Sequence, residues 1–587
     1  MTQTRFAPER DVRSRNFGSE RPFRERSRWG AALAGRGTGG RPGGRPWAWA
    51  AVAVVPVAFL AIFFAWPVGA LVAKGFFGES GFSLTGVSEM LTAPRTWRIV
   101  GQTLAQAVAG MAGSVLLGLP GAYLLYRCTF PGRRLLRAVV AVPFVLPTVV
   151  VGVAFKSLLV ASGPLGFLGL DASFPAIVAA LVFFNYSVVV RTVGGLWSRL
   201  DPRTAEAAKS LGASRARVWW TVTLPALAPA IAAAASLSFL FCATAFGTVL
   251  ILGGQSWGTI ETEIWYQTTQ LLDLPAAAAL SILQLAVVAA CLLVADATRA
   301  RQERALRLTG GTREQRLRTA DLPAVLVTAV VVIGLLVAPM ANLVWRSLQT
   351  DSGLGLGNYR NLAGEASGTI SVSVWQATLN SLATAAAATL IALSLGAMVS
   401  YLLSRRPVSR AGRGLLRAAD GAFMLPLGVS AVTVGFGFLI TLNRPPFDLR
   451  SSWLLIPIAQ AVVALPLVVR NLLPTLRAID PRMQQAAATL GAGPGRILAT
   501  IDAPLAWRAF GLSIGFAFAT SLGEFGATSF LARPDRPTLP VVIFQLIGRP
   551  GADNAGTAMA ASVVLAVLTA VVMAAAEWIG PKEVRPW

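Results

Sequence analysis

Histidine is absent from this chain of 587 residues, and cysteine, lysine and acidic residues are scarce. Without an imidazole, the chain can have neither a histidine metal ligand nor a histidine general base. The three cysteines, Cys128, Cys242 and Cys291, have no paired spacing, which argues against a disulfide framework or a zinc site. No nucleophile–base set is visible, so we expect neither an enzyme nor a metal site.

Lysine occurs at four positions, Lys74, Lys156, Lys209 and Lys582, and the other basic residues are arginines. A phosphate-binding P-loop needs a glycine-rich turn followed directly by Lys-Ser or Lys-Thr. None of the four lysines follows a glycine. We therefore expect no nucleotide or other cofactor on this chain.

Charge as a whole is scarce: 13% of the residues are charged and 55% are hydrophobic, and the mean hydropathy is +0.62. Soluble proteins carry about 25% charged residues. The uncharged stretches are long enough for helices that cross about 30 Å of hydrocarbon. We expect an all-α membrane protein with about twelve transmembrane helices, at residues 47–73, 101–126, 138–160, 173–190, 223–252, 275–295, 322–345, 376–403, 420–442, 452–469, 509–531 and 555–577.

The net charge of +24 comes from arginines that lie beside these apolar stretches. Such a pattern is typical of the positive-inside rule. We therefore expect the chain to lie in a lipid bilayer and to bind no nucleic acid. Basic residues are concentrated in the segments 127–137, 191–220, 296–321 and 404–417, whereas the segment 253–274 contains none. Twelve spans put the basic segments on one side, and both termini are then cytoplasmic.

An internal repeat divides the chain, because its two halves match at an offset of 279 residues. The matches include Asp201-Pro202-Arg203 with Asp480-Pro481-Arg482, Phe246-Gly247 with Phe525-Gly526, and Pro147 with Pro426. Two tandem six-helix repeats have the same orientation, and a pathway is expected between them. We expect a disordered Arg- and Gly-rich cytoplasmic tail at 1–46, transmembrane repeats at 47–297 and 322–579, a basic cytoplasmic linker at 298–321 and a C-terminal tail at 580–587.

One loop carries most of the functional information. Asp201 is a good N-cap, Pro202 suits the first helical position, and Gly212 can take the left-handed conformation that ends a helix. We expect a short helix, a sharp turn and a second helix that returns to the membrane. The residues that define this pattern are Glu206, Ala207, Ala208, Gly212, Leu224 and Pro225 in the first copy, and Gln485, Ala486, Ala487, Gly491 and Pro504 in the second.

The spacing Glu-Ala-Ala, three residues, Gly, nine residues, Ile-x-Leu-Pro resembles the signature of inner-membrane permease subunits of binding-protein-dependent ABC importers. The first copy departs from it at Val222, and the second at Gln485 and Ala503. The resemblance implies a type I importer-like fold in a bacterial plasma membrane. It also implies that each loop is a coupling helix that docks on an ABC ATPase homodimer, which would bind ATP and Mg. An extracytoplasmic solute-binding protein would be the third partner.

As a fused two-repeat permease of this length, the chain resembles two branches of the family, one for thiamine and one for ferric iron. The stretch Leu250–Gln267 and the stretch Ser521–Ala527 followed by Thr538-Leu539-Pro540 resemble the thiamine branch more closely, so a small cationic solute is favoured. Glu524 is the carboxylate inside a predicted span and is a candidate for the pathway. The alternative is a residue near the outer helix end, solvated or paired with Arg533 or Arg536. Asn185 and Tyr186 could line the pathway or form interhelical hydrogen bonds.

Two other classes remain possible from the residues alone. A secondary transporter driven by an ion gradient would also have repeats and twelve spans, but it would be expected to bury more ionisable residues and leaves the two matched loops unexplained. A membrane-anchored scaffold that binds nucleic acid would depend on residues 1–46.

Overall fold

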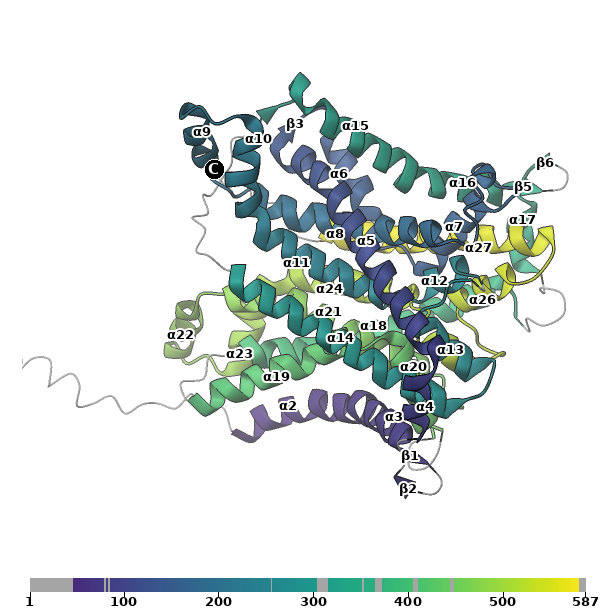
Figure 1. Cartoon of the computed structure of the whole chain (residues 1–587). Coiled ribbons are helices and arrows are strands. Elements are labelled where there is room, and N and C mark those ends of the chain that lie inside the picture. The colour runs from purple at the N-terminus through teal and green to yellow at the C-terminus, as the bar shows by residue number, and fades with distance from the viewer. Residues whose placement is uncertain are drawn as a thin grey trace, which may run out of the picture.

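The computed structural model describes residues 46–78, 81–82, 85–254, 256–302, 315–350, 353–364, 372–404, 410–443 and 448–579. Almost all of the predicted tail 1–46, the whole predicted tail 580–587 and half of the predicted linker 298–321 lie outside these ranges. The described residues form a bundle of helices with three pairs of two-residue strands (Figure 1).

The first half of the chain contains four long helices and a series of shorter ones. Its elements are α2 (Pro46–Leu60), η1 (Ala61–Ala65), α3 (Trp66–Phe76), β1 (Phe77–Gly78), β2 (Gly81–Phe82), α4 (Thr85–Thr92), α5 (Pro94–Arg127), β3 (Cys128–Thr129), α6 (Arg133–Ala141), η2 (Val142–Phe144), α7 (Thr148–Leu159), η3 (Gly166–Leu168), α8 (Phe174–Trp197), α9 (Pro202–Ser210), α10 (Arg215–Val218), η4 (Trp219–Thr223), α11 (Leu224–Ala243), α12 (Gly247–Leu252), α13 (Ile260–Thr269) and α14 (Leu274–Gln302).

The second half has a similar order. Its elements are β4 (Gln315–Arg316), η5 (Thr319–Asp321), α15 (Leu322–Val330), η6 (Val331–Val337), α16 (Ala338–Ser347), β5 (Gln349–Thr350), β6 (Gly353–Leu354), α17 (Gly357–Arg360), η7 (Asn361–Ala363), α18 (Val374–Ser404), α19 (Arg410–Gly428), α20 (Ala431–Thr441), α21 (Leu455–Ala478), α22 (Pro481–Thr489), α23 (Pro494–Ile497), η8 (Leu498–Asp502), α24 (Ala503–Leu522), α25 (Thr528–Leu531), α26 (Leu539–Ile547) and α27 (Ala552–Ile579).

The strands contribute little to the architecture. β1 pairs with β2 and β5 pairs with β6 in antiparallel turns, whereas β3 pairs in parallel with β4. That third pair joins the chain after α5 to the segment before α15. The fold is therefore all-α in its spans, as the sequence predicts.

Membrane-crossing helices account for most of the chain. Among the described residues, ten helices are long and apolar enough to cross a membrane, and two bent helix pairs bring the number to twelve if each is one span. The predicted spans 138–160 and 420–442 are these bent pairs. Arg133–Phe144 and Thr148–Leu159 meet at 103°, and Ala418–Pro426 and Ala431–Thr441 meet at 87°.

The bends correct one match of the repeat. Pro147, in an extended conformation, is the N-cap of α7. Its predicted counterpart Pro426 lies inside α19, whereas the N-cap of α20 is Ser430, also extended. The offset of 279 residues therefore does not hold at this point, because the segment before α20 is longer than the one before α7.

Two other predicted spans are interrupted. The span 223–252 contains α11, which ends at Ala243, and a separate helix α12 that begins at Gly247. The span 509–531 contains the end of α24 at Leu522 and the short helix α25. The predicted spans 173–190 and 452–469 are in fact longer, as α8 and α21 of 24 residues each.

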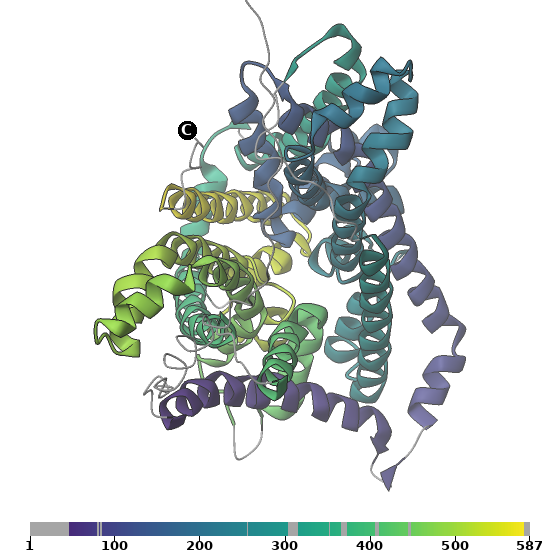
Figure 2. The same cartoon turned by 90° about the vertical axis from the view of Figure 1, so that its left-hand side faces the viewer.

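The first membrane helices of the two halves pack on the opposite halves. α2 lies against α18 and α3 against α20 of the second half, and α3 also packs on α14 of its own half. Between α2 and α3, the ring of Phe63 in η1 is 6.4 Å from the ring of Phe438 in α20. α15 and α16 lie against α5 and α7 of the first half, where the Asn342 amide donates to Ser157 Oγ at 3.0 Å. Figures 1 and 2 show α2 and α15 along the outer edges of the bundle. Each spatial half is therefore completed by the other half of the sequence.

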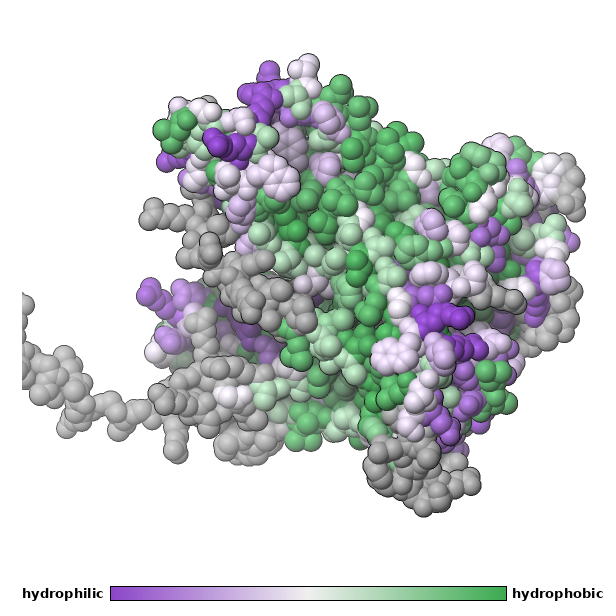
Figure 3. Space-filling view, viewed as in Figure 1, coloured by the Kyte–Doolittle hydropathy of each residue, from purple (hydrophilic) through white to green (hydrophobic). Residues whose placement is uncertain are grey.

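The largest core cluster joins the two halves. It contains Val149, Ile260 and Phe246 from the first half and Val432 and Phe525 from the second. On the face seen in Figure 3, hydrophobic surface covers the middle of the molecule, and hydrophilic residues gather toward its two ends. This surface suits a protein that crosses a bilayer.

Candidate functional site

The first predicted loop has the local structure that its sequence dictates. The Asp201 carboxylate accepts from the backbone N–H of Arg203 at 2.9 Å, and Pro202 opens α9. Gly212 has φ +83°, and the N–H groups of Gly212 and Ala213 donate to the carbonyls of Lys209 and Ala208. This is the glycine-ended Schellman arrangement, so the predicted cap residues at both helix ends are confirmed.

The second loop repeats this geometry at the same offset. Asp480 caps α22 by accepting from Arg482 N–H at 2.9 Å, and Gly491 also has φ +83°. Both loops then continue through a short helix and a π-helical turn into the membrane helices α11 and α24. Leu224 and Pro225 open α11, and Pro504 lies in the first turn of α24.

Both loops project from the same end of the bundle. Figure 1 shows α9 and α22 at its left-hand end, and Figure 2, viewed from that end, shows them lying apart from one another. In each loop the Glu206 or Gln485 side chain and the first alanine, Ala207 or Ala486, are exposed, whereas the second alanine is half-buried. That second alanine is Ala208 in α9 and Ala487 in α22.

Two leucines at the loop tips are residues that sequence reasoning missed. Leu211 and Leu490 occupy equivalent C-cap positions of α9 and α22 and are 89% and 88% exposed. A large apolar side chain held this far out of the fold is unusual unless another surface covers it. The signal was present in the sequence, since each motif glycine is preceded by leucine.

The two loops are not identical. In the second loop, Gln484 Nε2 donates to Asp502 Oδ1 at 2.7 Å, which ties α22 to the helical turn η8. The equivalent positions of the first loop are Ala205 and Thr223, which cannot form this bond. The first loop instead has the exposed carboxylate of Glu206 where the second has the neutral Gln485.

Asn185 and Tyr186 lie between helices of the first half. The Asn185 amide donates to Leu181 O at 2.9 Å and to Cys242 Sγ of α11 at 3.3 Å. Tyr186 is fully buried against α5, where a Cβ on Gly121 would lie 2.2 Å from its hydroxyl. The contact of Asn185 with Cys242 is interhelical, whereas the buried Tyr186 hydroxyl has no hydrogen-bond partner among the described residues.

Glu524 lies in the interruption between α24 and α25, and not inside a continuous span as predicted. The residue is 7% exposed, and its carboxylate accepts from the backbone N–H groups of Ala527 and Thr528 at 2.7 and 3.0 Å. Within the described residues, no ion pair joins it to Arg533 or Arg536. Arg533 pairs with Asp535 instead.

A second buried carboxylate, Glu261 of α13, lies in the segment 253–274 between two predicted spans. Glu261 is fully buried; Gln284 Nε2 donates to one of its oxygens at 2.9 Å, and Ser430 Oγ donates to the other at 2.5 Å. Its contact with Ser430 joins the two halves at the start of α20. The sequence around Glu261 could not reveal this contact, because Ser430 is 169 residues away.

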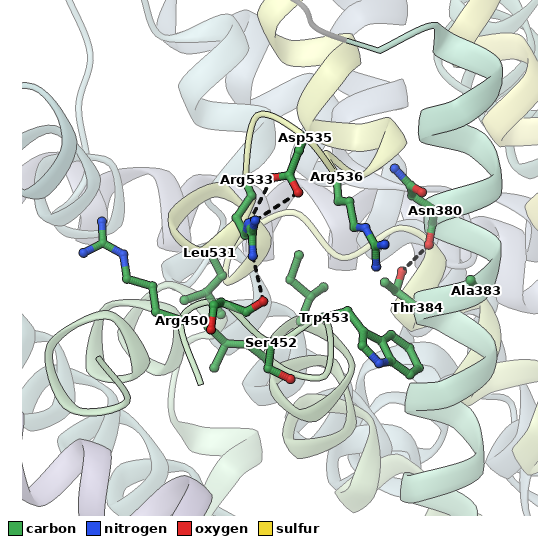
Figure 4. A pocket seen from close by; sticks show the side chains of 13 residues that line it. Asn380, Ala383, Thr384, Arg450, Ser452, Trp453, Leu531, Arg533, Asp535 and Arg536 are labelled. Carbon is green, nitrogen blue, oxygen red and sulfur yellow. Dashed lines mark hydrogen bonds and ion pairs between the residues drawn. The ribbon is translucent and has the colours of Figure 1, made fainter. Parts of the chain in front are cut away.

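A hollow of about 330 Å³ opens at the end of the bundle opposite the two loops. It is lined by Asn380, Thr384, Trp453 and three arginines. Figure 4 shows Arg533 reaching Asp535 and the backbone of Ser451, with Arg450 and Arg536 to either side. Its surplus of positive charge suits an acidic surface better than a cation.

Comparison with known proteins agrees with these features. The family model of the binding-protein-dependent transport system inner membrane component matches residues 114–308. The thiamine transport system permease protein ThiP of Brucella suis is 28% identical over 476 residues, which are 77% of this chain and 82% of the relative. The molybdenum transport system permease protein ModB of Escherichia coli K12 is 33% identical over 220 residues, which are 35% of this chain and 93% of the relative.

Among solved structures, a bacterial ABC transporter involved in the import of the acidic polysaccharide alginate matches with a TM-score of 0.38 and 18% identity, covering 44% of this chain and 96% of that one. The family model includes the whole of the first loop. ModB is matched over nearly its full length. The chain belongs to the inner-membrane components of binding-protein-dependent transport systems, the transmembrane and non-catalytic subunits of ABC importers.

Proposed function

We propose that this permease moves a small organic cation, thiamine-like in character, into the cytoplasm at the expense of ATP hydrolysed by a partner. The observation that carries the proposal is the pair of capped loops at one end of the bundle, each with an exposed leucine at its tip. The permease binds no cofactor itself. ATP and Mg belong to the ATPase.

The partner ATPase is a homodimer in this proposal. Each ATPase subunit binds one loop, and Leu211 or Leu490 inserts into the surface of that subunit. The small side chains of α9 or α22 permit a close approach. When ATP draws the two ATPase subunits together, α9 and α22 move toward one another and the two halves rock open on the opposite face. Hydrolysis returns them to the separated arrangement.

The end with α9 and α22 faces the cytoplasm of a bacterium in this proposal, and both termini lie on that side. The support is charge: the segments 127–137 and 191–220 are basic and lie at this end, as cytoplasmic segments of plasma-membrane proteins usually do. The solute-binding protein then docks at the other end, where Arg450, Arg533 and Arg536 offer a positive surface to its acidic residues.

Thiamine is favoured by the extended similarity to ThiP, which is a thiamine permease by name, over 77% of this chain. Ferric iron is the second candidate from sequence resemblance. An ion-gradient transporter remains the least supported class, because it gives no role to the matched loops.

Reconstitution tests the proposal. The chain would be placed in liposomes with its ATPase inside and its solute-binding protein outside, and uptake of radiolabelled thiamine and of ferric iron would be measured with and without ATP. We expect ATP-dependent thiamine uptake that an imposed ion gradient cannot replace. Uptake driven by the gradient alone, or ATP-dependent uptake of iron but not thiamine, would refute the mechanism or the substrate respectively.

A further inference from the structure

Four aromatic rings meet where the two halves join. Phe246 and Phe525 are stacked, with ring centroids 5.5 Å apart and planes at 19°. Trp265 meets Phe544 edge to face at 5.7 Å. The ring centroids of Phe246 and Trp265 are 6.5 Å apart, and those of Phe525 and Phe544 are 5.3 Å apart. We call these four residues the aromatic quartet.

The quartet is symmetric in the sequence repeat. Phe246 and Phe525 are 279 residues apart, and so are Trp265 and Phe544. Two equivalent residues that touch one another must lie at the axis that relates the repeats, and the pathway of a repeated transporter follows that axis. Phe246 and Phe525 each sit in the break between two helices, after α11 and α24. Broken helices are the usual site of contact with a transported solute.

The quartet closes this axis in the present structure. Phe246 and Phe525 are buried, and a Cβ added to Gly247 would lie 3.1 Å from Phe525 Cδ1. α12, α13 and α26 hold the rings near the end of the bundle away from α9 and α22 (Figure 1). The arrangement, with the two loops apart and the rings together, is closed toward the outer end.

Two buried carboxylates belong to the segments that carry the rings. Glu261 is one helical turn before Trp265 on α13, and Glu524 directly precedes Phe525. Both reach the start of α20. Glu261 accepts from Ser430, the N-cap of α20. Glu524 is near Ala431, because a Cβ added to Gly526 would lie 3.3 Å from Glu524 Oε1 and 2.9 Å from Ala431 Cβ. The two carboxylates therefore both lie near the start of α20.

Two buried polar atoms without a hydrogen-bond partner, on Gln284 and Trp265, belong to this junction. Within the described residues, neither Glu261 nor Glu524 has a basic side chain as an ion-pair partner. Gln284, which is 1% exposed and holds Glu261, has no partner for its Oε1, and the buried Trp265 Nε1 has no acceptor. Buried acidic groups without a counter-ion are costly inside a membrane protein and mark ion or substrate pathways.

We infer that the aromatic quartet is the gate of the translocation pathway and that, together with Glu261 and Glu524, it forms a transient site for a flat organic cation. This inference rests on the proposed function. When the halves rock apart, Phe246 and Phe525 separate and accept the ring of the solute between their faces. The ring faces carry negative potential, which attracts a cation, and the two carboxylates supply the opposite charge.

The first experiment locks the gate. Phe246→Cys and Phe525→Cys are combined in a chain whose Cys128, Cys242 and Cys291 are replaced by alanine, and a short bifunctional thiol reagent is added. We expect the cross-link to lower ATP-dependent uptake of radiolabelled thiamine at least about tenfold, because the rings could no longer separate.

The matched control joins Phe155→Cys to Phe183→Cys, a ring pair 5.8 Å apart within the first half. Its cross-link should leave uptake unchanged. Equal uptake by the two cross-linked proteins would overturn the gate. Failure of the reagent to join positions 246 and 525 in both the ATP-bound and the ATP-free complex would overturn it as well.

The second experiment tests charge selection without the ATPase or the binding protein, so its result is independent of the proposed function. Phe246→Ala with Phe525→Ala opens the gate in liposomes loaded with phenyltrimethylammonium or benzenesulfonate, which are flat rings of opposite charge. We expect the cation to leak roughly tenfold faster than the anion, and Glu261→Gln to remove most of that preference.

Equal leakage of the two probes, or a preference that survives Glu261→Gln and Glu524→Gln together, would overturn the cation site. A leak no faster than that of the wild-type chain would overturn the gate. Loss of ATP-driven uptake in the wild-type complex, with selective leakage retained, would refute the proposed function and leave the gate standing.

Discussion

At the scale of single residues, the breaks after α11 and α24 determine which side chains reach the junction of the halves. Both breaks are stabilised by small residues and by hydrogen bonds to freed backbone groups. Glu524 shows how this works: its carboxylate accepts two backbone N–H groups that the end of α24 leaves free. A buried carboxylate can thus serve local structure and remain beside a pathway.

Glu524→Gln should lower the stability of the protein. The amide keeps one acceptor oxygen where the carboxylate has two, so either Ala527 N–H or Thr528 N–H loses its partner. An unsatisfied buried donor costs about 1–3 kcal/mol. Thermal unfolding of the purified protein in detergent would measure the loss, with the exposed Glu577→Gln as control. Equal melting temperatures for both variants would contradict the capping role.

Gly247→Ala should disturb the junction for a steric reason. The added Cβ would lie 2.7 Å from Thr148 Oγ1 and 3.1 Å from Phe525 Cδ1, and overpacking of this kind costs about 1–3 kcal/mol. We expect a lower melting temperature and slower uptake. Gly195→Ala is the matched control, because nothing lies within 4 Å of its Cβ position. If the two variants behave alike, the close packing described for Gly247 is wrong.

At the scale of elements, local chemistry made the loops predictable and the breaks unpredictable. Asp201, Pro202 and Gly212 act within a few residues of themselves, so their caps could be predicted from the sequence alone. Hydropathy detects only an uncharged stretch, and such a stretch looks the same when it is straight, as in α8, or bent after Pro143. The spans 138–160 and 509–531 were therefore predicted as continuous.

Gly212→Ala combined with Gly491→Ala should weaken the grip of the ATPase. Both glycines have φ +83°, and a side chain in the left-handed region costs about 1–2 kcal/mol per residue. The turn would open and move Leu211 and Leu490. We expect the affinity of the detergent-solubilised permease for its ATPase to fall at least about tenfold. Gly495→Ala, in α23, should leave the affinity unchanged, because nothing lies within 4 Å of its Cβ position.

At the scale of the whole molecule, the exchange of first spans ties the halves together. α2 and α3 complete the second half, and α15 and α16 complete the first. The sequence could not predict this, because hydropathy defines a span but not its neighbour, and the repeat boundaries at 47–297 and 322–579 do not indicate which helices pack across them. Glu261 was missed for the same reason: its partner Ser430 is 169 residues away.

Cleavage between the halves should leave them associated. A protease site inserted between Leu308 and Thr309 would cut the chain after assembly. Since α2 packs on α18 and α15 packs on α5, we expect both fragments to co-elute in mild detergent and to keep ATP-dependent uptake within about twofold of the uncut chain. Separation of the fragments on a sizing column would show that the exchanged spans contribute little to cohesion.

The number of ATPase subunits held by one permease tests the central claim most directly. Native mass spectrometry of the complex purified from cells that express all partners should give two ATPase subunits per chain. Leu211→Asp combined with Leu490→Asp should release both, while Leu354→Asp, a 63% exposed leucine at the other end of the bundle, should release none. A complex that retains its ATPase with both loop tips altered, or a wild-type chain that binds none, would contradict the account.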